Sequence, residues 1–170
     1  MILIVEGIDR VGKSTLVEKL KKMVGFYPYH NDTNFKVEIM DNDNETDKLL
    51  KMLLICDASD PLIVFDRFHW TDYVYGTLER GYDNYKAVSN LKLLESELKK
   101  RDARIILVVP TDLESSSKQH GKDLSIHQGL FKALFNLTEL KKYCCDYNGI
   151  DEAVEWARRE LNEYIKESGC

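Results

Sequence analysis

The sequence predicts an α/β fold in which a parallel sheet of about five strands carries helices on both faces. Three short runs, at 1–5, 62–65 and 105–109, consist only of apolar residues and have the length of strands. Wholly apolar strands are typical of a parallel sheet that is covered on both sides. Between these runs, apolar residues recur at the spacing of amphipathic helices. The 170 residues suit one domain, 1–170, with no internal repeat or linker.

The first half of the chain begins with a strand that leads directly into a glycine-containing turn. In chain order we expect a strand at 1–5, a helix to about Met23, an extended aromatic piece at 26–30, a strand or edge segment at 35–39, an acidic loop at 41–45 and a helix at 48–57. The break after Met23 is expected because Gly25 stops helices.

The second half alternates strands and helices more regularly. We expect a strand at 62–65, an aromatic-rich helix from Phe68 to Gly76 or Gly81, a helix at 84–101, a strand at 105–109, a helix at 124–142, a strand at 143–147 and a final helix from Ile150. The stretch 111–123 has almost no large apolar residue after Leu113, and its serines and lysines suit a mobile loop.

Residues 7–15 read G-I-D-R-V-G-K-S-T and match the phosphate-binding loop pattern G-x-x-x-x-G-K-[ST]. Glycines let such a loop turn its N–H groups toward phosphate oxygens, and the following helix adds its positive end. Lys13 is expected to reach the β- and γ-phosphates, and the Ser14 hydroxyl to ligate Mg²⁺. Because an apolar strand precedes the motif and a helical pattern follows it, we predict a three-layer P-loop NTPase fold.

Asp66 and Arg67 follow the second apolar run. The carboxyl end of a central parallel strand borders the crevice in which such sheets bind ligands. A carboxylate at Asp66 can hold Mg²⁺, directly or through water, and the Arg67 guanidinium can bind an acceptor phosphate in a bidentate manner. An ordinary salt bridge at a strand end is the alternative interpretation.

Composition excludes several classes of function. The net charge of −5 gives no basic field for nucleic acid or acidic lipid, so neither is expected as a partner. The four cysteines, at 56, 144, 145 and 170, form no C-x-x-C pair, which argues against a zinc site. With no leader-like or membrane-spanning run evident, we expect a cytoplasmic protein with reduced thiols.

Residues 6–15, together with Asp66-Arg67-Phe68 and Tyr147-Asn148-Gly149, resemble the thymidylate kinase family of nucleoside and nucleotide kinases. The resemblance covers most of the chain in the family's order, and it implies that 111–123 is a lid. Some members carry an arginine in the phosphate loop and none in the lid; here Arg10 lies in the loop and 111–123 contains no arginine. The family's R-x-P stretch has no arginine here, and Lys36 or His30 are candidates to replace it.

The resemblance, combined with the motif, implies a full set of site residues. The catalytic residues are Lys13, Arg10, Arg67 and Asp9; the ATP-binding residues are Gly7, Ile8, Asp9, Arg10, Val11, Gly12, Lys13, Ser14, Thr15 and Tyr147; the Mg²⁺ ligands are Ser14 and Asp66; and the acceptor-binding residues are Glu6, Asp9, Asp66, Arg67, Phe68 and Trp70. The rings at Phe35, Phe68, Trp70 and Tyr73 could stack on a base or pack in the core.

The implied activity is transfer of the γ-phosphoryl group of ATP, with Mg²⁺, to a deoxynucleoside monophosphate, dTMP or a related pyrimidine nucleotide. One alternative is a deoxynucleoside kinase that uses Glu6 as general base toward a 5′-hydroxyl. A second alternative is a protein that binds nucleotide without turnover. Relatives of this kind are often dimers, so a homodimer stays an open expectation beside a monomer.

Overall fold

The computed structural model of the chain describes residues 1–24 and 63–168. The segments expected at 26–30, 35–39, 41–45 and 48–57 lie outside these ranges, as do Phe35, Lys36 and His30. No helix within the described ranges is long and apolar enough to cross a membrane.

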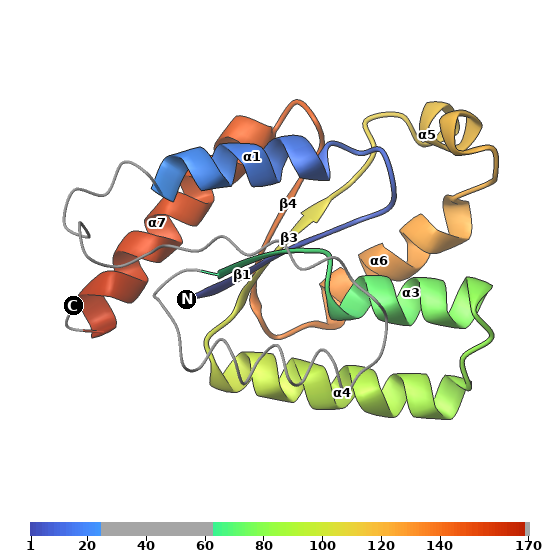
Figure 1. Cartoon of the computed structure of the whole chain (residues 1–170), viewed down its shortest axis with the longest axis horizontal. Helices are drawn as coiled ribbons and strands as arrows, with labels where there is room; N and C mark the ends of the chain where they lie inside the picture. The colour runs from blue at the N-terminus through green and yellow to red at the C-terminus, as the bar shows by residue number, and fades with distance from the viewer. Residues whose placement is uncertain (25–62, 169–170) are drawn as a thin grey trace.

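The described residues contain a four-stranded parallel sheet in the order β2-β1-β3-β4 (Figure 1). Its strands are β1 (Ile2–Glu6), β2 (Ile63–Asp66), β3 (Arg104–Val108) and β4 (Lys141–Cys145). The apolar runs therefore form strands as predicted, while the fifth expected strand, at 35–39, falls outside the described ranges. Residues of β1 and β3 are buried throughout, as expected for central strands covered on both faces.

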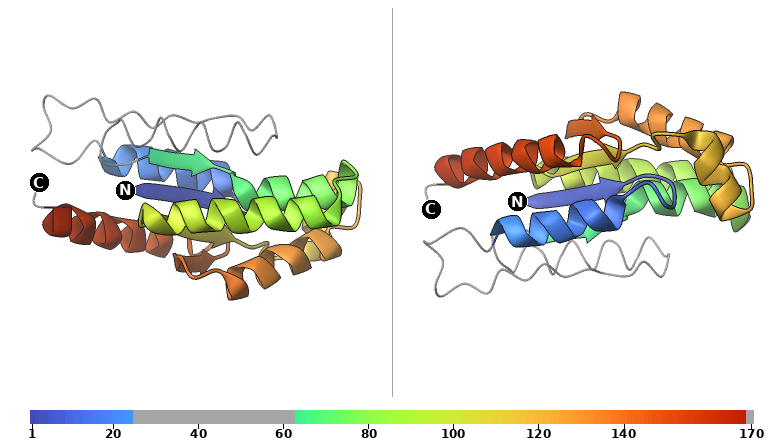
Figure 2. Two further views of the ribbon diagram at one scale, coloured as in Figure 1. Left: turned by 90° about the horizontal axis from the view of Figure 1, so that it is seen from below. Right: turned by 90° about the horizontal axis from the view of Figure 1, so that it is seen from above.

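Helices cover both faces of this sheet (Figure 2). On one face α1 (Lys13–Val24) packs against α7 (Ile150–Ser168). On the other, α3 (His69–Glu79) packs against α4 (Asn84–Lys100) and α6 (Ser125–Leu137). The α/β architecture with helices on both faces is confirmed.

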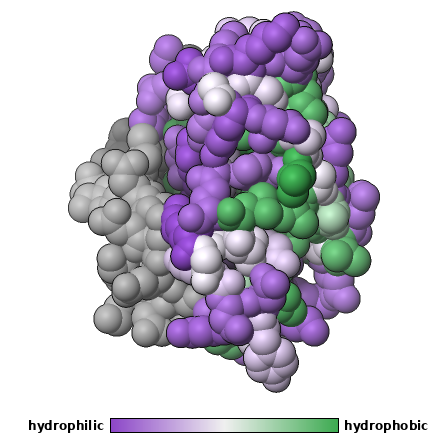
Figure 3. All heavy atoms as spheres, turned by 90° about the vertical axis from the view of Figure 1, so that its right-hand side faces the viewer, coloured by the Kyte–Doolittle hydropathy of each residue, from purple (hydrophilic) through white to green (hydrophobic). Residues whose placement is uncertain are grey.

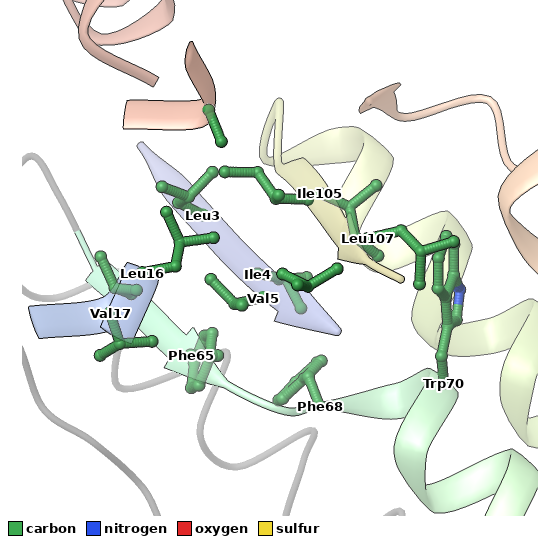
Figure 4. Packing of buried hydrophobic residues seen from close by; sticks show 14 of the residues in the cluster. Leu3, Ile4, Val5, Leu16, Val17, Phe65, Phe68, Trp70, Ile105 and Leu107 are labelled. Atoms are coloured by element: carbon green, nitrogen blue, oxygen red, sulfur yellow. The ribbon is translucent and has the colours of Figure 1, made fainter. Parts of the chain in front are cut away.

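The core lies where the central strands meet these helices (Figure 4). Side chains of β1, β3 and α1 belong to one buried cluster, which also contains Phe65 and Phe68, whose ring centroids lie 4.5 Å apart. Burying large aliphatic and aromatic side chains from both layers supplies most of the driving force for folding. The same packing fixes the carboxyl ends of β1 and β2 side by side, with Val5 paired to Asp66.

The prediction of a loop at 111–123 is wrong for most of that stretch. It contains α5 (Leu113–His120), whose N-cap Asp112 accepts a hydrogen bond from the Glu114 backbone N–H at 3.0 Å. Gly121 ends the helix with a left-handed backbone, φ 76°. Caps at both ends therefore outweigh the weak helix propensity of the serines between them.

The helix predicted at 124–142 is shorter than expected, because α6 ends at Leu137. Thr138 adopts an extended conformation, and its hydroxyl donates to Glu95 Oε2 at 2.6 Å. The chain then enters β4 at Lys141, two residues before the predicted strand begins. A tertiary hydrogen bond thus ends a helix that the apolar pattern alone would continue.

Candidate functional site

The loop between β1 and α1, residues 7–12 (the glycine-rich loop), lies at the carboxyl edge of the sheet. Gly7 and Gly12 have φ values of 140° and 99°, which favour glycine, and Arg10 is also left-handed at 61°. A Cβ at Gly7 would stand 2.2 Å from the carbonyl oxygen of Val108 on β3. Only glycine fits there, because both the backbone angle and the space exclude a side chain.

Lys13 begins α1 directly after this loop, and its side chain is buried. Its ammonium group donates a hydrogen bond to the carbonyl oxygen of Ile8 across the loop. Burial, aided by the nearby Arg67 guanidinium, lowers the pKa of Lys13 to about 8, against the opposing charges of Asp9, Asp66 and Glu6. A desolvated cation at a helix N-terminus is well placed to bind an anion.

The Asp9 side chain links the glycine-rich loop to the end of β2 and to α5. Its Oδ1 accepts from the guanidinium of Arg67, which follows β2, and its Oδ2 accepts from Nε2 of His120 on α5 at 2.9 Å. Burial alone would raise the pKa of Asp9, but Arg67, His120 and Lys13 together hold it below its ordinary value. The carboxylate is therefore ionised near neutral pH and bridges two cationic or hydrogen-bonding side chains.

Glu6, the last residue of β1, has no exposed surface and accepts hydrogen bonds from the start of α3. One oxygen accepts from the N–H groups of Phe68 at 2.9 Å and Trp70 at 3.0 Å, and the other accepts from the Thr71 hydroxyl. The carboxylate thus caps a helix inside the protein, and the predicted role of Glu6 in binding acceptor, or as a general base, stays a prediction.

Asp66 and Arg67 lie between β2 and α3, next to Phe68, whose N–H donates to Glu6. Arg67 has a left-handed backbone, φ 72°, and its N–H donates to the carbonyl oxygen of Val5 at 2.9 Å. The Oδ1 atom of Asp66 is buried and has no hydrogen-bond partner in the described ranges. A buried carboxylate oxygen without a donor is costly, so this atom is suited to meet a ligand or cation.

The remaining residues of the motif at 7–15 differ in how exposed their side chains are. Ile8 and Val11 are buried and anchor the loop in the core, whereas Arg10, Ser14 and Thr15 are exposed at its surface. Tyr147, which follows β4, is 56% exposed. Its ring lies against Gly12, where a Cβ would come within 2.7 Å of it. The structure thus places the predicted ATP-side residue Tyr147 beside the glycine-rich loop.

Phe68 and Trp70 do not reach this site. Both side chains are completely buried, and the Trp70 indole N–H donates to Glu95 Oε1 at 2.8 Å (Figure 4). The prediction that these rings bind the acceptor base is wrong, because they pack in the core. Tyr73 is likewise packed against the core, although only partly buried.

Two features of the site could not be found from the sequence. His120 reaches Asp9 from 111 residues away in the chain, and no local pattern marks it. Glu95 on α4 accepts hydrogen bonds from His69, Trp70 and Thr138, and so ties the start of α3 to the end of α6. Burial alone would raise the pKa of Glu95, but these hydrogen bonds and the charge of His69 lower it.

Comparison with known proteins shows the fold. No protein-family model matches the sequence, and no curated protein matches it significantly. A solved structure of the YorR protein from Bacillus subtilis, in complex with phosphorylated GDP, is similar with a TM-score of 0.68. The two sequences are 21% identical, and the similarity covers 99% of this chain and 98% of that one. This chain therefore shares the α/β fold of that protein over nearly its whole length.

Proposed function

We propose that this protein is a Mg²⁺-dependent kinase that transfers the γ-phosphoryl group of ATP to a deoxynucleoside monophosphate, with dTMP as the first acceptor to test. The observation that carries the proposal is the convergence of Lys13, Asp9, Asp66 and Arg67 at the mouth of a glycine-rich loop. The complex of YorR with phosphorylated GDP supports nucleotide binding on this fold. The resemblance of residues 6–15 to nucleotide kinases supports the choice of reaction.

On the donor side, the glycine-rich loop and Lys13 bind the ATP phosphates. Ile8 and Val11 anchor this loop in the core, so its geometry is set before ATP arrives and little ordering is needed on binding. Arg10 is exposed at the loop and supplies the cation that neutralises charge on the transferring group. Such an arginine contributes about 10³–10⁵ to the rate in related chemistry.

Mg²⁺ fits the residues present. No cluster of three or more His, Cys, Asp or Glu side chains within 1–24 and 63–168 could hold a metal. Mg²⁺ needs no such cluster, since it is usually held by one or two carboxylates together with substrate phosphates and water. The unpartnered oxygen of Asp66 and the exposed hydroxyl of Ser14 would hold the ion, which would neutralise charge on the β- and γ-phosphates.

On the acceptor side, Arg67 binds the phosphate of the monophosphate and Asp9 orients it. An ionised monophosphate needs no general base, so the burial of Glu6 does not hinder this reaction. A 5′-hydroxyl acceptor would need a general base. The Glu6 carboxylate is buried and accepts hydrogen bonds from the start of α3, so it is not exposed to such an acceptor. The geometry therefore favours the monophosphate over the nucleoside.

Transfer from γ-labelled ATP, with Mg²⁺, to each nucleoside monophosphate and each deoxynucleoside tests the proposal. Both pyrimidine and guanine nucleotides belong in the panel. Lys13→Ala should abolish transfer, whereas Lys19→Ala removes the same charge from the same helix, at an exposed pair with Asp151, and should leave it intact.

A labelled diphosphate from one monophosphate would support the proposal and identify the base. Label on nucleosides alone would overturn the choice of acceptor. Tight binding of ATP without transfer to any acceptor would assign the protein to nucleotide binding without turnover.

A further inference from the structure

His120 is the one residue of α5 that contacts the group of charges at the glycine-rich loop among the described interactions. Its Nε2 binds Oδ2 of Asp9, while Arg67 occupies Oδ1 of the same carboxylate. Of the other α5 residues, Leu113 packs against the core and Ser116 is buried, while Glu114, Ser115, Lys118 and Gln119 are exposed and hydrophilic (Figure 3). The helix thus presents a single imidazole to the site.

The other ring nitrogen of His120 is unsatisfied. Nδ1 is buried and has no hydrogen-bond partner in the described ranges, although the side chain as a whole is 25% exposed. Because Asp9 is an ionised acceptor, the Nε2–H of His120 donates to it. Nδ1 is then the atom that remains available, and leaving it buried without a partner is costly.

We propose that His120 is a ligand of the acceptor phosphate, which Nδ1 contacts while Asp9 holds Nε2. This assignment rests on the proposed function, because it requires an acceptor that carries a phosphate. Arg67 and His120 contact the two oxygens of one carboxylate, so Asp9 holds both side chains at the glycine-rich loop, where the acceptor phosphate would bind. A carboxylate that fixes one nitrogen of an imidazole orients the other nitrogen for its partner.

The contact depends on protonation. A neutral ring that donates from Nε2 has only a lone pair at Nδ1, so donation to a phosphate oxygen requires the doubly protonated ring. Asp9 from the loop, Arg67 from the end of β2, Lys13 from α1 and Tyr75 from α3 form the charged and titratable surroundings of this pair. Phosphate binding through Nδ1 therefore requires this form of the ring, so acceptor affinity should fall as pH rises.

The variant His120→Gln tests the contribution of Nδ1 separately from that of Nε2. The glutamine amide can still donate to Asp9, but it offers nothing in place of Nδ1. We expect the acceptor KM to rise about ten- to a hundred-fold, the loss typical of a hydrogen bond to a charged group. The KM for ATP should not change, and the acceptor KM should lose its dependence on pH. Lys118→Gln removes an exposed cation from the same helix and should match the wild-type protein.

An unchanged acceptor KM in His120→Gln would overturn the assignment, as would an equal rise in the KM for ATP. A rise in both constants with a large loss of melting temperature would assign His120 a structural role instead.

Ring ¹⁵N NMR of the wild-type protein gives a test that needs no variant. Acceptor monophosphate, or inorganic phosphate if no monophosphate is a substrate, should shift the Nδ1 signal of His120. No change at Nδ1 under saturating monophosphate would refute the proposal. A kinase assay that fails on every monophosphate refutes the proposed function by itself, and the phosphate titration then decides the role of His120 separately.

Discussion

Replacing Glu6 separates its role as a helix cap from a role in catalysis. Glu6→Ala would leave the N–H groups of Phe68 and Trp70 without their acceptor inside the protein. Each orphaned buried donor costs about 1–3 kcal/mol, so we expect a loss of about 4 kcal/mol. For a chain of this length, that loss lowers the melting temperature by about 8–16 °C.

Glu6→Gln should be much milder. The amide oxygen can still accept from both N–H groups, and only the charge is lost. Burial raises the pKa of Glu6, despite the opposing charge of His69 and the hydrogen bonds from Thr71 and Phe68. The charge is therefore worth little here, and we expect a loss of about 1 kcal/mol, in the range of a charge at a helix N-terminus.

Thermal unfolding of both variants, with transfer rates measured well below the midpoint, checks this reasoning. The folded fraction of Glu6→Gln should keep a kcat close to that of the wild type. A melting temperature of Glu6→Ala equal to the wild type would show that the cap carries no stability. A stable Glu6→Gln protein that loses about 10²–10⁴ in kcat would restore Glu6 as a general base.

Three further predictions follow from the same geometry. Because burial lowers the pKa of Lys13 to about 8, the ammonium is charged below that pH and neutral above it. The affinity for ATP, measured by calorimetry, should therefore weaken between pH 7 and 9, and an affinity that does not change with pH would contradict this. Gly7→Ala should abolish ATP binding through its clash with Val108, whereas Gly129→Ala, in open space on α6, should stabilise the protein by about 0.5–1 kcal/mol in denaturant unfolding. Because the pKa of Glu95 is lowered in the folded protein, the ionised carboxylate stabilises the fold above the ordinary pKa of 4.5, and this stabilisation is lost as the pH falls below that value. The free energy of unfolding of Glu95→Gln should therefore fall less steeply with acid than that of the wild type.

The strongly periodic parts of the fold could be predicted from the sequence. Wholly apolar runs predicted β1, β2 and β3, since strands that are covered by helices on both faces tolerate such composition. The spacing of glycines and Lys13 located the loop, because its conformation leaves few residue types possible. These signals are local, and local sequence is enough to carry them.

Elements and contacts that depend on distant partners could not be predicted. The serine-rich α5 is stabilised by its two caps, and Leu137 ends α6 because Thr138 is held by Glu95. Phe68 and Trp70 have the composition of a base-stacking site, and only the packing of three layers shows that they are core. Aromatic residues serve both purposes, so their type alone does not decide between them.

The indole of Trp70 has a practical consequence for following this protein in solution. The chain contains two tryptophans, and the second, Trp156, stacks on Tyr143 at 5.4 Å between rings, on the far strand and the last helix. Trp156→Phe would leave one tryptophan, Trp70, completely buried three residues after Arg67 and shielded from solvent quenchers. The intrinsic fluorescence of Trp70 would then report on the start of α3, and it could follow the binding of each substrate over time without an attached label.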